Sequence, residues 1–371
     1  MLKPLRPLRI LLSALVGVIL VLGVWSMQPQ PPSPFHKPPS QGRVRVSGRD
    51  LLVDGQPFQI RGVGYSPVPI GRRVGEHDMY ADPALWGRDL PALRALHANT
   101  IRTWSEVTSH DLLRAAYNDG HDPIYTIMGF WVEPSLDLHD PAVRADLIAR
   151  FRRYVATYKD EPGVLLWGVG NEVNMGYRGA KRDWYSLLND LGQAAYAVEG
   201  ATYHPVATAN WEILAIGDAQ AGASDADLPG LDLWGLTAYR GRDFGDLFTA
   251  YAARSQKPLW IAEFGVDAWD ARAGREDAAA QADYDGALWD QIAAHSAVAV
   301  GGTVMAYMDE WWKAGNPHAQ TPGGFPNPFF PDGRMDEAYF GLVAVRSAPS
   351  GGPDALLPRT AYYALQTRWA R

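Results

Sequence analysis

Two glutamates have the surroundings that could do chemistry in this 371-residue chain. Glu172 lies in segment 164–174, VLLWGVGNEVN, and Glu263 lies in segment 257–267, KPLWIAEFGVD. In each segment an apolar run of strand length precedes the acid, and such a run is typical of a buried parallel strand. Two strands that each present a carboxylic acid at the C-terminal end would supply the acid/base and the nucleophile of a retaining glycosidase.

The elements that must position these acids follow from the alternation of strand-like and helix-like segments after residue 42. Residues 54–55, Asp-Gly, indicate a hairpin turn near the start. The predicted strands are 58–65, 100–105, 124–132, 164–170, 205–211, 233–239, 259–264 and 298–308. The predicted helices are 89–98, 111–118, 141–158, 183–198, 246–254, 278–295 and 360–369. Eight such strands predict a (β/α)8 TIM barrel that forms a single catalytic domain. An open doubly wound sheet is the rival, but no Gly-x-Gly-x-x-Gly follows the first strand and no P-loop is present.

Chemistry in such a barrel gathers where the strands end, so the polar residues there are the candidates. They are Arg102, Glu106, Glu133, Asn171, Glu172, Asn210, Glu212, Tyr239, Arg240, Glu263, Asp309, Glu310 and Trp311. Strands four and seven lie nearly opposite each other, so Glu172 and Glu263 could meet across a sugar.

Several motifs resemble the retaining β-glycosidases of glycoside hydrolase clan A. WGVGNEVN resembles that clan's strand-four motif, in which Asn-Glu supplies the acid/base, and IAEFG resembles its strand-seven motif, in which Glu is the nucleophile. LLVDGQPFQIRGVGYSP and DLPALRALHANTIRTWS resemble the start of the barrel in family 2-like enzymes. The same stretch, together with GNEV, resembles the family 72 β-1,3-glucanosyltransferases of fungi. The likeness covers most of residues 50–345.

The resemblance implies a role for several residues. Glu172 becomes the general acid/base, with a pKa raised by the neighbouring carboxylate, and Glu263 becomes the nucleophile. Asn171 would bind the sugar 2-hydroxyl. Tyr239 would orient Glu263 through its hydroxyl, and Arg102 would keep Glu263 ionised. Either Trp311 or Trp312 would form the floor of the sugar site, since alternation points one inward and one outward.

Several of these residues could instead have a purely structural role. Asn171 could be a turn residue, Arg102 could form an ordinary ion pair, and Tyr239 could be packing. Asn210 could bind a hydroxyl or serve the fold. We interpret the remaining acids at the strand ends as residues of the barrel rim without a role in the chemistry. One or two of them, Glu133 among them, are expected to bind sugar hydroxyls.

Composition excludes several classes of protein. The formal net charge is −7, and because residues 1–42 carry +4 the remainder carries −11, which argues against nucleic acid as a partner and against a highly anionic substrate. With no cysteine, disulfides and a thiol nucleophile are excluded. The nine histidines form no His-x-His or His-Glu-x-x-His motif, and no Gly-x-Ser-x-Gly occurs. We therefore predict no metal and no cofactor.

The N-terminus reads as a membrane segment. Residues 10–27, ILLSALVGVILVLGVWSM, are uncharged and long enough to span a bilayer, and Lys3, Arg6 and Arg9 precede them. This pattern predicts a single-pass signal anchor over 1–27 in the cytoplasmic membrane, with the catalytic portion on the periplasmic or other extracytoplasmic side. A cleaved signal peptide, giving a secreted protein, is the rival. Residues 28–41 hold six prolines and predict an extended linker, which leaves 42–371 as the glycosidase domain.

The sequence thus predicts a retaining glycosidase that acts on a β-linked glycan. Transglycosylation with the same two glutamates is the first alternative, and a non-catalytic glycan-binding barrel is the second. The residues do not separate hydrolysis from transfer, and they give neither the sugar nor the oligomeric state.

Overall fold

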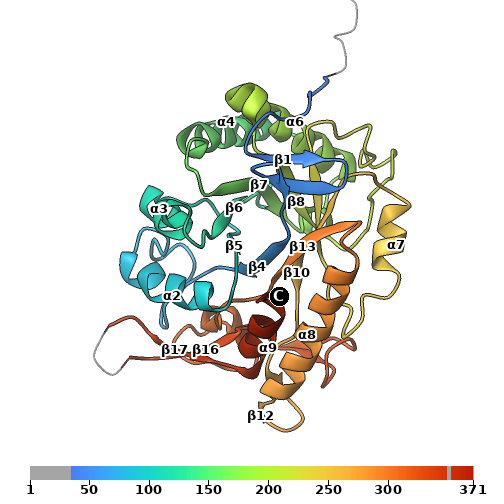
Figure 1. Ribbon diagram of the computed structural model, residues 1–371. Coiled ribbons are helices and arrows are strands. Elements are labelled where there is room, and N and C mark those ends of the chain that lie inside the picture. Colours follow the sequence, from blue (N-terminus) through green and yellow to red (C-terminus); the bar gives the residue numbers. More distant parts are fainter. Residues whose placement is uncertain (1–34, 349–351, 371) are drawn as a thin grey trace, which may run out of the picture. The chain divides into compact units, whose positions relative to one another are not determined.

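Eight parallel strands close into a barrel in the computed structural model of the chain, which describes residues 35–348 and 352–370 (Figure 1). The barrel strands are β4 (Ile60–Gly64), β5 (Thr100–Arg102), β6 (Tyr125–Phe130), β7 (Val164–Asn171), β8 (Val206–Trp211), β9 (Leu233–Thr237), β10 (Leu259–Phe264) and β13 (Ala299–Val304). They neighbour one another in chain order, and β13 pairs with both β10 and β4 to complete the ring. The predicted (β/α)8 barrel is confirmed.

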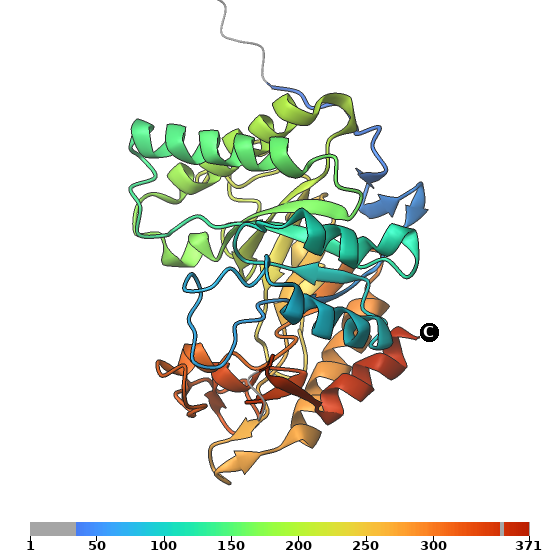
Figure 2. The same cartoon turned by 90° about the vertical axis from the view of Figure 1, so that its left-hand side faces the viewer.

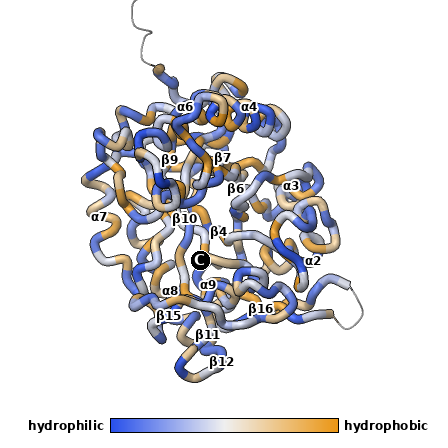
Figure 3. Tube along the Cα trace, turned by 180° about the vertical axis from the view of Figure 1, so that it is seen from behind, coloured by the Kyte–Doolittle hydropathy of each residue, from blue (hydrophilic) through white to orange (hydrophobic). Residues whose placement is uncertain are grey.

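Helices follow most of the barrel strands and cover the outside of the ring. They are α2 (Pro83–Ala95), α3 (His110–Tyr117), α4 (Pro141–Tyr158), α5 (Val173–Gly176), α6 (Lys181–Glu199), α7 (Leu247–Ala252), α8 (Ala278–Ala294) and α9 (Thr360–Trp369). Figure 3 shows hydrophobic and hydrophilic residues interleaved along these helices, as expected for elements with one buried side and one solvent-facing side.

Local signals explain where the helices begin. Helix α4 starts at the predicted residue because Asp140 accepts a hydrogen bond from the Ala142 backbone N–H and Pro141 fits the first helical turn. Helix α2 begins six residues before the predicted start, since Asp82 caps it in the same way and Pro83 opens it. Residues 89–95 of the predicted helix are therefore the second half of α2, which ends before residues 96–98.

A small sheet closes the end of the barrel where the strands begin. It consists of β1 (Val44–Ser47), β2 (Asp50–Val53) and β3 (Gln56–Pro57), and the turn at Asp54 and Gly55 has the left-handed backbone that the Asp-Gly pair predicts. Buried Val44 and Leu51 belong to the same apolar cluster as Leu233 at the start of β9. In Figure 2 this blue sheet lies at the opposite end of the barrel from the long loops.

Three further hairpins, which the sequence did not predict, stand at the strand ends of the barrel. They pair β11 (Trp269–Asp270) with β12 (Arg275–Glu276), β14 (Phe325–Pro326) with β15 (Arg334–Met335), and β16 (Val343–Arg346) with β17 (Ala355–Pro358). Arg359, which follows β17, forms a buried two-point ion pair with Asp309, with nitrogen–oxygen distances of 2.7 and 2.8 Å. Asp309, a candidate at the strand ends, therefore anchors the C-terminal segment.

The predicted membrane segment, residues 10–27, lies outside the described residues, as do residues 28–34 of the Pro-rich stretch 28–41. Within the described part of the chain, no helix is long and apolar enough to cross a membrane. The described residues from 37 onward form one compact unit. The limits of the anchor, the linker and the catalytic domain remain predictions.

Candidate active site

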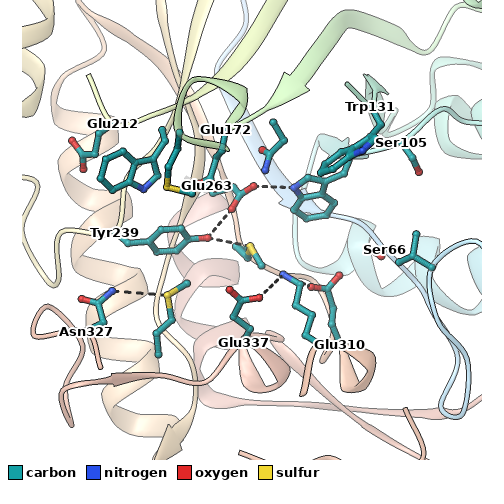
Figure 4. Close-up of a pocket in the computed structure, with 18 of the residues that line it drawn as sticks. Ser66, Ser105, Trp131, Glu172, Glu212, Tyr239, Glu263, Glu310, Asn327 and Glu337 are labelled. Atoms are coloured by element: carbon teal, nitrogen blue, oxygen red, sulfur yellow. Dashed lines mark hydrogen bonds and ion pairs between the residues drawn. The ribbon is translucent and has the colours of Figure 1, made fainter. Parts of the chain in front are cut away.

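A cavity of about 1380 Å³ opens at the end of the barrel where the strands finish, and both glutamates line it. Figure 4 shows Glu172 and Glu263 pointing into the same space, with Tyr239 beside them. Glu263 lies near the end of β10, and Glu172 follows the last residue of β7. The two segments that the sequence singled out are thus brought together at one site.

Three donors hold the carboxylate of Glu263, which is only 5% exposed. Arg102 Nη1 donates to Oε1 at 2.6 Å, Trp104 Nε1 donates to Oε1 at 2.9 Å, and the Tyr239 hydroxyl donates to Oε2 at 2.8 Å. Burial by itself would raise the pKa of Glu263, but the positive charges of Arg102 and Lys313 and these hydrogen bonds bring it below its usual value. Glu263 is therefore ionised at neutral pH.

The indole of Trp104 reaches Glu263 because β4 leaves room for it. A Cβ atom on Gly64 would lie 2.5 Å from the Trp104 ring, so a larger residue there would displace the indole. The guanidinium of Arg102 lies 4.8 Å from the centre of the same ring, which adds a cation–π contact. Trp104 was missed in the sequence, although it stands two residues after the candidate Arg102.

Glu172 has a different environment. Its backbone is left-handed, with φ of 50°, where the chain turns from β7 into α5, and its side chain accepts a hydrogen bond from the Thr237 hydroxyl at 2.5 Å. Among the described residues it forms no ion pair. Burial, together with the negative charge of Glu263, raises the pKa of Glu172 to about 7. Glu172 therefore retains its proton over much of the range in which Glu263 is ionised.

Asn171, the residue before Glu172, also lines the cavity. Its Oδ1 accepts a hydrogen bond from Arg102 Nη2 at 2.6 Å, so Arg102 bridges Asn171 and Glu263. Because the carbonyl oxygen is taken, the amide nitrogen of Asn171 is the end left to donate to a ligand. This geometry is compatible with the predicted contact to a sugar hydroxyl.

The segment after β13 differs from the prediction. Strand β13 ends at Val304, and Trp311–Ala314 form a short 3-10 helix, η3, rather than extended strand. Strand alternation therefore does not apply to Trp311 and Trp312. Trp312 lines the cavity, whereas Trp311 is not part of the lining.

The same turn brings Lys313 into the cavity, a residue that the sequence did not single out. Its ammonium lies 3.0 Å from Glu310 Oε2 and 3.4 Å from Glu337 Oε2. Figure 4 shows these two glutamates below Tyr239 and Glu263. Burial opposes its charge, but these acids and Glu263 raise the pKa of Lys313 above the ordinary lysine value. The strand predicted over 298–308 did not indicate that the chain turns back beyond it. This turn brings Lys313, five residues after the predicted end, into the cavity.

Two predicted sugar contacts do not agree with the structure. The Asn210 side chain is buried, accepts a hydrogen bond from the Tyr185 hydroxyl, and donates to the carbonyls of Glu212 and Leu214. Its hydrogen-bonding capacity is used in holding the loop after β8, so it has no role in the cavity. Glu133 is exposed, accepts a hydrogen bond from the Trp131 indole, and lies outside the cavity lining.

Two acid–base pairs flank the cavity instead. Glu106 accepts from Arg150 at 2.8 Å, and Glu212 is bound at two points by Arg240, with the shortest contact at 2.5 Å. Like Glu172, Glu212 has a left-handed backbone, with φ of 52°, at the turn after a barrel strand. Among the described residues, no group of three or more histidine, aspartate or glutamate side chains is arranged to hold a metal ion.

The fold and the site define the class of protein as a (β/α)8 barrel with a buried glutamate near the end of β10 and a partly buried glutamate directly after β7. No protein-family model matches the chain. A 1,3-beta-glucanosyltransferase of Saccharomyces cerevisiae is 32% identical over 122 residues, which cover 32% of this chain and 25% of the yeast protein. The chain thus matches only a quarter of the length of that curated relative.

Solved structures resemble most of the described barrel. A b-glucuronidase from Ruminococcus gnavus superimposes with a TM-score of 0.65 at 18% identity, covering 88% of this chain and 52% of that one. A GH2 beta-galacturonidase from Eisenbergiella tayi gives a TM-score of 0.63 at 14% identity, covering 90% and 54%. At these identities the likeness shows the fold alone. The sequence and structure comparisons together fit a barrel of the glycoside hydrolase clan A type.

Proposed function

We propose that this chain is a retaining glycosidase that cleaves a β-linked oligo- or polysaccharide by double displacement. The observation that carries the proposal is the pair of glutamates that line one cavity in surroundings that shift their pKa values in opposite directions. Glu263 is held ionised by Arg102, and Glu172 has a pKa raised to about 7. Two titratable groups whose environments separate their pKa values are the mark of an acid and a nucleophile in this chemistry.

In the first step, a Glu263 carboxylate oxygen attacks the anomeric carbon while Glu172 gives its proton to the departing glycosidic oxygen. The C–O bond to the leaving group breaks as the bond to Glu263 forms, and a glycosyl-enzyme results. In the second step, Glu172, now ionised, removes a proton from water. The water oxygen bonds to the anomeric carbon and releases Glu263. The amide of Asn171 donates to the sugar 2-hydroxyl during both steps.

The size of the cavity supports a substrate of more than one sugar. Its volume of about 1380 Å³ exceeds the roughly 300–1,000 Å³ of typical small-molecule sites. Trp131, Trp211 and Trp312 contribute to its walls, and flat rings suit the C–H faces of pyranoses. Four exposed apolar side chains also stand around it: Val74, Met175, Phe325 and Phe329.

Transglycosylation is the second candidate, and the match to the yeast 1,3-beta-glucanosyltransferase favours it. The same two glutamates serve, and a sugar hydroxyl replaces water in the second step. Mass spectrometry of the products from a β-glucan oligosaccharide separates the two activities. Products longer than the starting material favour transfer, whereas exclusively shorter products favour hydrolysis.

The proposed function is tested by covalent capture of the nucleophile. A 2-deoxy-2-fluoro glycosyl fluoride of the cleaved sugar should label the wild-type chain, and peptide mass spectrometry should find the label on Glu263. The Glu263→Gln variant is the matched control and should remain unlabelled. Sugar binding without labelling would contradict catalysis and favour a non-catalytic glycan-binding barrel.

We further propose that residues 1–27 anchor residues 42–371 to the outer side of the cytoplasmic membrane through the linker 28–41. The uncharged run 10–27 behind Lys3, Arg6 and Arg9 supports this. The full chain should sediment with membranes, resist extraction by high salt and be digested by protease added outside. Recovery of a chain shortened at its N-terminus in the medium would instead indicate cleavage and secretion.

A further inference from the structure

Acidic side chains outnumber basic side chains in the lining of the cavity. Seven carboxylic acids and three basic side chains belong to the lining. Protonation of Glu172 removes one negative charge, which still leaves the acids in excess. A bound ligand therefore meets a lining whose formal charge is negative.

Each basic side chain of the lining is already paired with a glutamate. Arg150 lies 2.8 Å from Glu106, and Arg240 holds Glu212 at two points and also lies 3.3 Å from Asp246.

Lys313 lies between Glu310 and Glu337 and is largely buried. Arg102, which stands behind the nucleophile rather than in the lining, is shared by Glu263 and Asn171. Within the described lining, then, every cation has a carboxylate partner.

From this pairing we infer that the site takes a neutral β-glycoside and discriminates against a uronide, an inference that rests on the proposed function. A sugar carboxylate would lose its water in a negatively charged cavity without an unpaired cation to replace it. The chain would then differ in substrate class from the glucuronidase and galacturonidase whose barrels it resembles.

The same pairs suit a neutral sugar. A carboxylate that one cation binds still has lone pairs that accept hydrogen bonds, and sugar hydroxyls are donors. Glu106, Glu212 and Glu337 therefore offer acceptors for hydroxyl groups around the cavity, with their charges balanced by Arg150, Arg240 and Lys313. The ion pairs both exclude an anionic sugar and provide contacts to an uncharged one.

The test compares aryl β-glycosides that differ only at C6. The pairs are the glucoside with the glucuronide and the galactoside with the galacturonide, with the mannoside added as a third neutral sugar. The kcat/KM of the best neutral substrate should exceed that of either uronide by at least about 100-fold. A uronide cleaved as fast as the best neutral glycoside would overturn the inference while leaving the proposed function intact.

Two variants test the physical cause. Among the described residues, Glu106→Gln leaves Arg150 without a carboxylate partner, and Glu212→Gln leaves Arg240 with only the exposed Asp246. At least one of the two variants should raise the uronide-to-neutral ratio about tenfold. Glu276→Gln, which alters an ion pair with Arg359 outside the cavity, is the control and should leave the ratio unchanged. An unchanged ratio in both test variants would contradict the inferred cause.

Failure of the proposed function gives a different result. In that case none of the five glycosides is turned over and no fluoroglycoside labels Glu263. This outcome overturns both proposals, whereas labelling of Glu263 by a fluorinated uronosyl fluoride alone overturns the substrate class and supports the glycosidase.

Discussion

The ends of β7 and β10 each present a glutamate to one cavity, but the surroundings of the two glutamates shift their pKa values in opposite directions. At β10, Glu263 receives hydrogen bonds from a guanidinium, an indole and a phenol, and its pKa is lowered. At β7, Glu172 receives one hydroxyl bond from Thr237, and burial beside a like charge raises its pKa to about 7. Acidity is therefore set by the neighbours, and the difference divides one residue type between two roles.

The largest effect should come from removing the ionised member of the pair. Glu263→Gln should lower kcat on the best aryl glycoside by roughly 10⁵–10⁶-fold, because no covalent intermediate can form. Circular dichroism and a thermal melt should show that the fold is retained. Residual activity above about 1% of wild type, free of contaminating wild-type enzyme, would count against Glu263 as nucleophile.

Removing the protonated member should have a smaller effect that depends on the leaving group. Glu172→Ala should cost about 10²–10⁴-fold with a sugar leaving group, which needs protonation, and much less with dinitrophenolate, which does not. Rates for the two substrates are measured side by side. Equal losses on both would show that Glu172 does not act as the acid.

The next largest effect on activity should come from removing one hydrogen bond to Glu263. Tyr239→Phe removes one donor to the carboxylate, and since hydrogen bonds to charged groups contribute about 1.5–3 kcal/mol, kcat should fall by about 10–100-fold. Tyr362→Phe is the matched control, because that hydroxyl donates to the Ala92 carbonyl outside the cavity. A similar fall in both variants would argue for a structural role of Tyr239.

The smallest change should be in the pH profile. Glu172 must be protonated in the first step, so activity should fall as pH rises through about 7, and it should fall again in acid when Glu263 gains a proton. Thr237→Val removes a donor that favours the ionised form of Glu172, so the alkaline limb of kcat/KM should move upward by up to about one pH unit. A downward shift would reverse the assigned role of Thr237.

The sequence predicted what depends on local pattern. The barrel, the positions of Glu172 and Glu263, and the exact extents of α4, α9 and β10 follow from apolar runs and from caps that lie within a few residues of them. Arg102 and Tyr239 were placed beside Glu263 through the family resemblance, and the structure has them in contact.

The remainder depends on contacts between distant segments. Trp104 reaches Glu263 because Gly64 on another strand lacks a side chain, and Lys313 lines the cavity because η3 turns back after β13. Asn210 was expected at the cavity, but Tyr185 from α6 takes its carbonyl oxygen. Neither residue spacing nor composition indicates which residue of a distant segment will contact a given side chain.

The point at which the described chain joins the barrel has a bearing on access to the cavity. Lys37 is nearly buried, donates to Gly230 O and pairs with Asp232 at 2.6 Å, just before β9 begins, so it is fixed at the end closed by the β1–β3 sheet. A tether through the residues before Lys37, as proposed above, would therefore attach at the closed end of the barrel. Lys37 and the mouth of the cavity thus lie at opposite ends of the barrel, so the chain enters this domain on the side away from the two glutamates.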